Sequence, residues 1–195
     1  MINSLTEIIF LLDRSGSMSG LENDTIGGFN SLTEKQSKLD GETAVTVVLF
    51  DHEYEVLWNG IDAKRAKLTK KDYYVRGTTA LLDAVGKTIL EVDQRLLKTN
   101  EERLPGNIIF VITTDGMENA SREFSHDKVK QLIKRQQDEY NWEFIFMGAN
   151  IDAAKEAGNI GIDVEHAYSF EASNKGVENM YVMAEEAITL KRKKK

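Results

Sequence analysis

The stretch EIIFLLDRSGSM, residues 7–18, joins a continuous apolar run to a polar turn that begins at Asp13. An apolar run of this length that stops sharply at an acidic residue is typical of a strand buried on both faces of a parallel sheet. A second run, NIIFVITT at residues 107–114, stops in the same way at Asp115. The two runs predict central parallel strands with an aspartate at each carboxyl end.

Helical periods and further apolar runs alternate along the rest of the chain. The predicted helices cover 21–39, 80–97, 125–140, 151–157 and 173–190, and the further strands cover 43–50, 52–58, 142–147 and 164–170. The link at 51–53 is too short for a parallel crossover, so the strands beside it form a hairpin. The pattern predicts an α/β domain with a doubly wound, mostly parallel sheet, one antiparallel edge strand and helices on both faces. Gly27 and Gly28 interrupt the first helix, and we expect them to pack closely against the sheet.

The composition narrows the class of protein. The 195 residues include no cysteine, which excludes disulfides and thiolate metal sites and fits a reducing compartment. No apolar run approaches the ~18 residues that a membrane span needs, and the first seven residues lack the features of a signal peptide. We therefore expect a cytoplasmic protein that makes no membrane contact.

The charge is unevenly distributed along the chain. Lys and Arg number 25 against 32 Asp and Glu, and the last five residues, 191–195, are all basic. Without these five, 20 basic side chains face 32 acidic ones, and such an acidic body repels phosphate backbones. We expect no nucleic-acid partner, one domain over 1–190, and a basic, disordered tail over 191–195.

The turn after the first strand carries oxygen-bearing side chains at alternate positions. Asp13, Ser15 and Ser17 form a D-x-S-x-S pattern, which can place all three on one side of an extended or tightly turned segment. Gly16 allows the backbone to turn tightly between the two serines. A competing interpretation is that Asp13 and Ser15 only cap the helix that follows.

Two further loops can meet this turn. Thr78 and Thr79 lie directly before a predicted helix, and Asp115 ends the second central strand. Because ligands bind outside the carboxyl ends of the strands in such sheets, the three loops can converge on one point. Carboxylate and hydroxyl oxygens suit Mg²⁺, Mn²⁺ or Ca²⁺ and make a poor zinc site.

At these residues the sequence resembles the von Willebrand factor type A domain, whose metal-ion-dependent adhesion site combines a D-x-S-x-S loop, a threonine loop and a later aspartate. The matching segments are LLDRSGSM at 11–18, TALLDA at 79–84 and ITTDG at 112–116. Asn119 lies where many prokaryotic members carry a polar residue. The likeness extends over nearly the whole chain and identifies it as similar to the stand-alone prokaryotic (bacterial) members. The helix start favours Thr79 over Thr78, which stays an alternative.

The resemblance implies a six-stranded, Rossmann-like sheet and a bound divalent metal, Mg²⁺ first, with Mn²⁺ or Ca²⁺ as alternatives. It implies that Ser15, Ser17 and Thr79 hold the metal directly or through water, while Asp13 and Asp115 largely support them. The metal then keeps a coordination position for a carboxylate, so the expected partner is a protein that offers an acidic side chain. The implied function is protein binding, and the chain is not expected to be an enzyme.

Two other functions remain open at this point. One is a scaffold or assembly protein that acts with an ATPase or stress-response partner without direct metal-mediated contact, and the other is a metal-dependent hydrolase. A phosphatase of the haloacid dehalogenase type needs a second acid two residues after its nucleophile, where this chain has Ser15.

Residues beside the motifs have simpler expected roles. We expect Arg14 at the rim of the site and Asp83 in a solvated or capping role. Glu118 and Asn119 follow Asp115 closely enough to reach the water shell of a metal.

Overall fold

A computed structural model describes residues 4–193 and contains a sheet of six strands in the order β3-β2-β1-β4-β5-β6. The strands are β1 (Thr6–Asp13), β2 (Thr43–Phe50), β3 (Tyr54–Asp62), β4 (Asn107–Thr114), β5 (Glu143–Ala149) and β6 (Ala167–Phe170). All neighbouring strands are parallel except β2 and β3, which pair antiparallel at one edge. The predicted fold class is therefore confirmed, including its single antiparallel edge strand.

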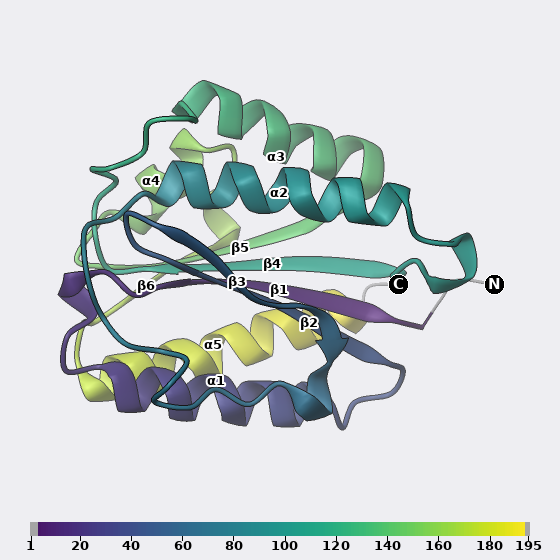
Figure 1. Ribbon diagram of the computed structural model, residues 1–195, viewed down its shortest axis with the longest axis horizontal. Coiled ribbons are helices and arrows are strands. Elements are labelled where there is room, and N and C mark those ends of the chain that lie inside the picture. The colour runs from purple at the N-terminus through teal and green to yellow at the C-terminus, as the bar shows by residue number, and fades with distance from the viewer. Residues whose placement is uncertain (1–3, 194–195) are drawn as a thin grey trace.

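Five helices cover the two faces of this sheet (Figure 1). They are α1 (Glu22–Gln36), α2 (Leu81–Leu97), α3 (His126–Tyr140), α4 (Ala153–Asn159) and α5 (Asn174–Lys193). Helices α1 and α5 lie on one face, and α2 and α3 lie on the other, where α4 also packs. Among residues 4–193, no helix has the length and apolar character needed to cross a membrane.

The central strand β1 explains why the first apolar run lacks alternation. Ile8, Phe10 and Leu12 belong to the core beneath α1 and α5, whereas Ile9 and Leu11 belong to the core beneath α2 and α3. Side chains alternate between the two faces of a strand, and here both faces are covered. All five are fully buried.

Most element boundaries agree with the sequence to within a few residues, and two differences lie at the edges of the sheet. Strand β3 continues to Asp62, and its pairing with β2 contains a register shift. The predicted strand over 164–170 begins as a single 3₁₀ turn, so only the last four residues pair with β5.

The two glycines inside α1 do not pack against the sheet, so that expectation is wrong. Gly28 faces Tyr181 of α5, and a Cβ atom there would lie 2.3 Å from the tyrosine ring. A Cβ atom on Gly27 would meet nothing within 4 Å. Gly28 therefore serves the contact between α1 and α5.

The predicted disordered tail is also wrong for residues 191–193, because α5 continues through Lys193. The Lys191 ammonium donates a hydrogen bond of 2.5 Å to Glu143, the first residue of β5. The Arg192 guanidinium donates to the Gln36 carbonyl and to Thr43 Oγ1 at 3.2 and 2.9 Å. Residues 194 and 195 of the predicted tail lie outside the described residues.

Candidate metal-binding site

The candidate site lies at the carboxyl edge of the sheet, beside the two central strands. From β1 the chain places β2 and β3 on one side, and it then crosses to place β4, β5 and β6 on the other side. The strand order therefore reverses between β1 and β4. Asp13 is the last residue of β1, and Asp115 directly follows β4. Such a reversal is where ligands bind in doubly wound sheets.

The D-x-S-x-S loop brings its two serine hydroxyls together. The Ser15 backbone N–H donates to Asp13 Oδ1 at 2.7 Å, which fixes the start of the turn. A short 3₁₀ turn, Gly16–Met18, follows, and the Ser15 and Ser17 hydroxyl oxygens lie 3.2 Å apart. The Ser17 hydroxyl donates to Asp115 Oδ1 at 2.5 Å, so this loop contacts the end of β4 directly.

The threonine loop completes the cluster through Thr79. A Cβ atom on Gly116 would lie 2.9 Å from Thr79 Oγ1 and 3.5 Å from Ser17 Oγ, so both oxygens border the same spot. The Thr79 backbone N–H donates to Asn119 Oδ1 at 3.0 Å. Thr79 is buried, whereas Thr78 is exposed and lines a neighbouring groove. The structure therefore brings all five residues of the predicted set together, and it places Thr79 rather than the alternative, Thr78, in the cluster.

Both carboxyl groups of the cluster are buried. Burial raises the pKa of Asp13 to about 6, against hydrogen bonds from Ser15 and Thr114 that lower it, and the nearby Asp115 charge adds to the rise. Burial also raises the pKa of Asp115, against the Ser17 hydrogen bond. The second Asp115 oxygen, Oδ2, is buried and has no hydrogen-bond partner within residues 4–193.

These features fit a bound cation. Two desolvated carboxylates and an orphaned carboxylate oxygen leave the site short of positive charge, and a bound cation would compensate for this deficit. The donors are hydroxyl and carboxylate oxygens, which are the ligands of Mg²⁺, Mn²⁺ and Ca²⁺. Across the described part of the chain, no group of three or more His, Asp or Glu side chains is arranged to hold a metal, so the hydroxyls are needed here.

The acids and amides nearest to Asp115 hold the loops in place. The Glu118 carboxylate accepts from the backbone N–H groups of Leu82 and Ala120 at 2.9 and 3.0 Å. Asn119 is occupied by Thr79. These hydrogen bonds hold both side chains against the threonine loop and the start of α2. Asp83 neither caps a helix nor stays solvated as expected, because it accepts from three successive backbone N–H groups at 122–124, in the loop before α3.

Arg14 is fully buried, so its expected place at the rim is wrong. Its Nε donates to Asp51 Oδ2 at 2.9 Å, and its Nη1 donates to Glu55 at 2.7 Å. Asp51 is also fully buried, and the sequence analysis missed it. A signal was available, because Asp51 directly follows β2 as Asp115 directly follows β4.

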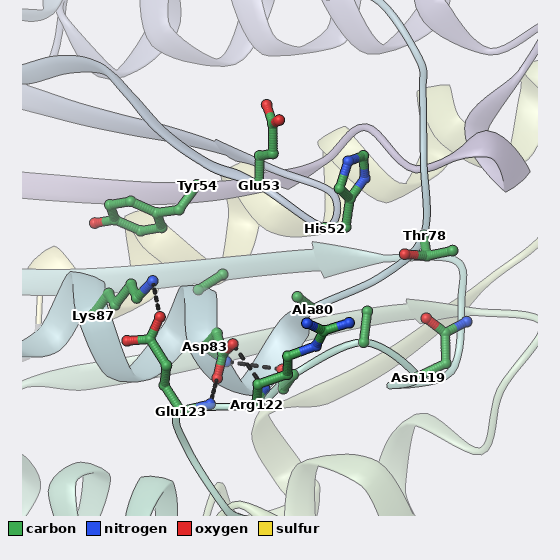
Figure 2. A pocket seen from close by; sticks show the side chains of 13 residues that line it. His52, Glu53, Tyr54, Thr78, Ala80, Asp83, Lys87, Asn119, Arg122 and Glu123 are labelled. Carbon is green, nitrogen blue, oxygen red and sulfur yellow. Dashed lines mark hydrogen bonds and ion pairs between the residues drawn. The ribbon is translucent and has the colours of Figure 1, made fainter.

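A groove of about 930 Å³ lies beside the threonine loop. Figure 2 shows that the β2–β3 turn, the start of α2 and the segment after Asn119 line it. Lys87 is paired with Glu123 at 2.7 Å, and Asp83 is held by backbone groups, so these charges already have partners. Thr78 and Asn119 line the groove at the end next to Thr79.

Comparisons with known proteins give a fold but no sequence relative. No family model and no curated protein matches the chain. One similar solved structure is that of proximal thread matrix protein 1 from the mussel byssus, with a zinc-occupied MIDAS motif. It is 16% identical, with a TM-score of 0.68, and the match covers 96% of this chain and 47% of that one. The ArnB paralog VWA2 from Sulfolobus acidocaldarius is 17% identical, with a TM-score of 0.57 over 91% of this chain and 44% of that one.

Manganese-loaded TRAP protein from Plasmodium vivax is 19% identical, with a TM-score of 0.64 over 92% of this chain and 73% of that one. The present chain thus spans less than half the length of the mussel and Sulfolobus proteins. These likenesses agree with the strand order, the antiparallel edge and the five helices described above. The chain therefore has the von Willebrand factor type A fold.

Proposed function

We propose that this protein is a divalent-cation-dependent protein-binding module that captures a carboxylate of a partner protein. Ser15, Ser17 and Thr79 would hold the cation, with Asp13 and Asp115 in support. When bound, the cation supplies positive charge and a coordination position for a partner's Asp or Glu side chain. The observation that carries the proposal is the convergence of these side chains around an Asp115 oxygen that is buried without a partner.

The chain's own hydrogen bonds orient the donors in advance. Thr114 Oγ1 donates to Asp13 Oδ2 at 2.6 Å, and the Ser15 N–H holds the other Asp13 oxygen, so the carboxylate is fixed at both ends. Among the described residues, the cluster contains two carboxylates, Asp13 and Asp115, whose combined charge equals that of one divalent cation in magnitude. A partner's carboxylate would therefore meet little net repulsion.

We propose Mg²⁺ as the cation. The donors in the cluster are hydroxyl and carboxylate oxygens, which Mg²⁺ accepts while it keeps several waters. The solved structures named above hold zinc in one protein and manganese in another, so the fold accommodates more than one divalent cation.

We also infer that the site binds rather than catalyses. The Ser15 and Ser17 hydroxyls hydrogen-bond to each other, and the Ser17 hydroxyl also donates to Asp115. Within residues 4–193, no imidazole is paired with either hydroxyl, so neither serine has the histidine base of the Ser-His-Asp arrangement.

Cation binding is tested by comparing Thr79→Ala with Thr78→Ala, which removes the same atoms one residue away. A cation at about 100 times its dissociation constant should stabilise the native protein by about 2.7 kcal/mol relative to a chelator. We expect this stabilisation to persist in Thr78→Ala and to fall sharply in Thr79→Ala. Equal stabilisation of both variants, measured by urea unfolding with MgCl₂ or with EDTA, would place the cation elsewhere.

Partner chemistry is tested by selecting random peptides from a phage library on the immobilised native protein with MgCl₂. We expect the selected peptides to be enriched in Asp or Glu, to be released by EDTA, and not to bind Thr79→Ala. Peptides without an acidic residue, or peptides that stay bound in EDTA and bind Thr79→Ala equally, would instead support a scaffold without metal-mediated contact.

A further inference from the structure

We propose that Asp51 is a positioning residue of the metal site, which fixes the threonine loop against the D-x-S-x-S loop without touching a cation itself. The inference rests on the proposed function in so far as the site binds a cation. It assigns a role to the fully buried ion pair of Arg14 and Asp51, which the five residues of the site do not explain.

Asp51 joins two arginines from different loops. Arg14 Nε and Arg76 Nε both donate to the same oxygen, Asp51 Oδ2, at 2.9 Å. The other oxygen, Oδ1, accepts from the Glu53 backbone N–H at 2.6 Å, so the carboxylate cannot rotate without losing a bond. Arg14 lies between Asp13 and Ser15, and Arg76 lies three residues before Thr79. One carboxylate thus connects both loops that would supply hydroxyl ligands.

Backbone contacts place the two loops directly against each other at this cluster. The Arg76 N–H donates to the Arg14 carbonyl at 2.8 Å, and the Gly16 N–H donates to the Gly77 carbonyl at 3.1 Å. The Ala80 N–H donates to the Asp51 carbonyl at 2.8 Å. A displacement of the arginine pair would therefore move the backbone on either side of Thr79.

The close fit at Gly77 makes this arrangement sensitive to small shifts. Gly77 has φ +71°, and a Cβ atom there would lie 2.1 Å from His52 Nδ1. His52 follows Asp51 in the chain, so the β2–β3 turn packs against the bare backbone of the threonine loop. The Tyr74 ring also lies near both guanidinium groups, at 5.5 Å from Arg14 and 5.8 Å from Arg76.

Stability alone explains this cluster poorly. Arg14 Nη2 is buried and has no hydrogen-bond partner among the described residues. A buried ion cluster is often no more stabilising than apolar side chains of the same volume. Fixing the relative positions of two ligand-bearing loops is a role that apolar side chains would not perform equally well.

The test compares Asp51→Asn with Glu55→Gln. In Asp51→Asn, the position of the oxygen shared by the two arginines holds either an amide nitrogen, which cannot accept, or an uncharged amide oxygen. Glu55, by contrast, pairs with Arg14 but not with Arg76 or the threonine loop. Mn²⁺ affinity is measured by the electron paramagnetic resonance of free Mn²⁺. We expect Asp51→Asn to weaken Mn²⁺ binding by about 10-fold to 100-fold, which is the usual effect of losing a residue that orients metal ligands. Glu55→Gln should change the Mn²⁺ affinity by less than about 2-fold.

A second readout needs no metal. Hydrogen exchange of the metal-free protein should show faster exchange at Arg76 and Ala80 in Asp51→Asn and unchanged exchange in Glu55→Gln. Where Asp51→Asn fails to fold, Arg76→Gln replaces it, because Arg76 is more than one-third exposed and its loss removes only the threonine-loop side of the cluster.

The outcomes separate this inference from the proposed function. Native-like Mn²⁺ affinity and exchange in the folded variant overturn the positioning role, even where acidic peptides bind the native protein. Weakened Mn²⁺ binding in the variant supports the positioning role, even where the native protein binds no acidic peptide and the partner proposal fails. A native protein that binds no Mn²⁺ overturns both.

Discussion

Replacing Asp13 with asparagine should make the metal-free protein more stable at neutral pH. The folded structure raises the pKa of this carboxyl from 3.8 to about 6, chiefly through burial. Because the folded state holds the proton more tightly than the unfolded state, protonation stabilises the fold. That contribution is fully present below the unfolded pKa and is lost as the pH rises through 6.

The magnitude follows from the size of the shift. A rise from 3.8 to about 6 corresponds to about 3 kcal/mol in full. The native protein loses about 2.4 kcal/mol of it between about pH 4 and about pH 7, because the unfolded carboxyl is already more than half ionised at about pH 4. Asparagine does not ionise, so the variant avoids this loss. Its amide can also retain both contacts, because its oxygen can accept from the Ser15 N–H and its nitrogen can donate to Thr114 Oγ1. The Thr114 hydroxyl, which donates to Asp13 in the native protein, would then donate to the Gly116 carbonyl instead.

The assay is urea unfolding in EDTA at about pH 4 and about pH 7.5, for the native protein and for Asp13→Asn. We expect the free energy of unfolding of the variant to gain about 2.4 kcal/mol relative to the native protein between the two values. Asp138→Asn, at an exposed position of α3, controls for the loss of one negative charge. A native-minus-variant difference that stays constant across this pH range would refute the reasoning.

Three further substitutions test packing around the site and in the core. Gly116→Ala should weaken Mn²⁺ binding by about 10-fold or more while the fold survives, because its methyl group would lie 2.9 Å from Thr79 Oγ1; titration of Mn²⁺ into the folded variant checks this. Gly28→Ala should destabilise the protein by about 1–3 kcal/mol against the Tyr181 ring, and unchanged urea unfolding would contradict it. Gln136→Met should raise stability by about 1 kcal/mol, since both amide atoms are buried without partners among the described residues; a lower melting temperature would argue against this.

The sequence predicts the parts of this structure whose cause is local. β4 is recognisable because its apolar run is buried on both faces and stops at an acid. The hairpin of β2 and β3 follows from a link too short for any other connection. The meeting of the candidate site residues follows because strand ends in a doubly wound sheet lie at one edge, which brings Ser17 and Asp115 together across 98 positions.

The remaining features depend on contacts between segments that the sequence does not relate. The burial of Arg14 requires the register of β1 on β2, which pairs Asp13 with Phe50 and so sets Arg14 beside Asp51. A charged residue is seldom buried without such a partner, so a surface position is the natural expectation. The end of α5 is held by Gln36 of α1, a contact across 156 positions that no local pattern encodes.

The anchoring of Lys191 on Glu143 has a consequence for how the molecule can be attached to other things. It places the end of α5 at the amino edge of the sheet, where β1 also begins at Thr6, whereas Asp13 and Asp115 lie at the opposite edge. A tether attached near Thr6 or near Lys193 would therefore extend from the side of the domain opposite the site. Under the proposed function, several copies tethered to one surface would all present their sites outward. Simultaneous engagement would then raise the effective concentration of individually weak carboxylate contacts.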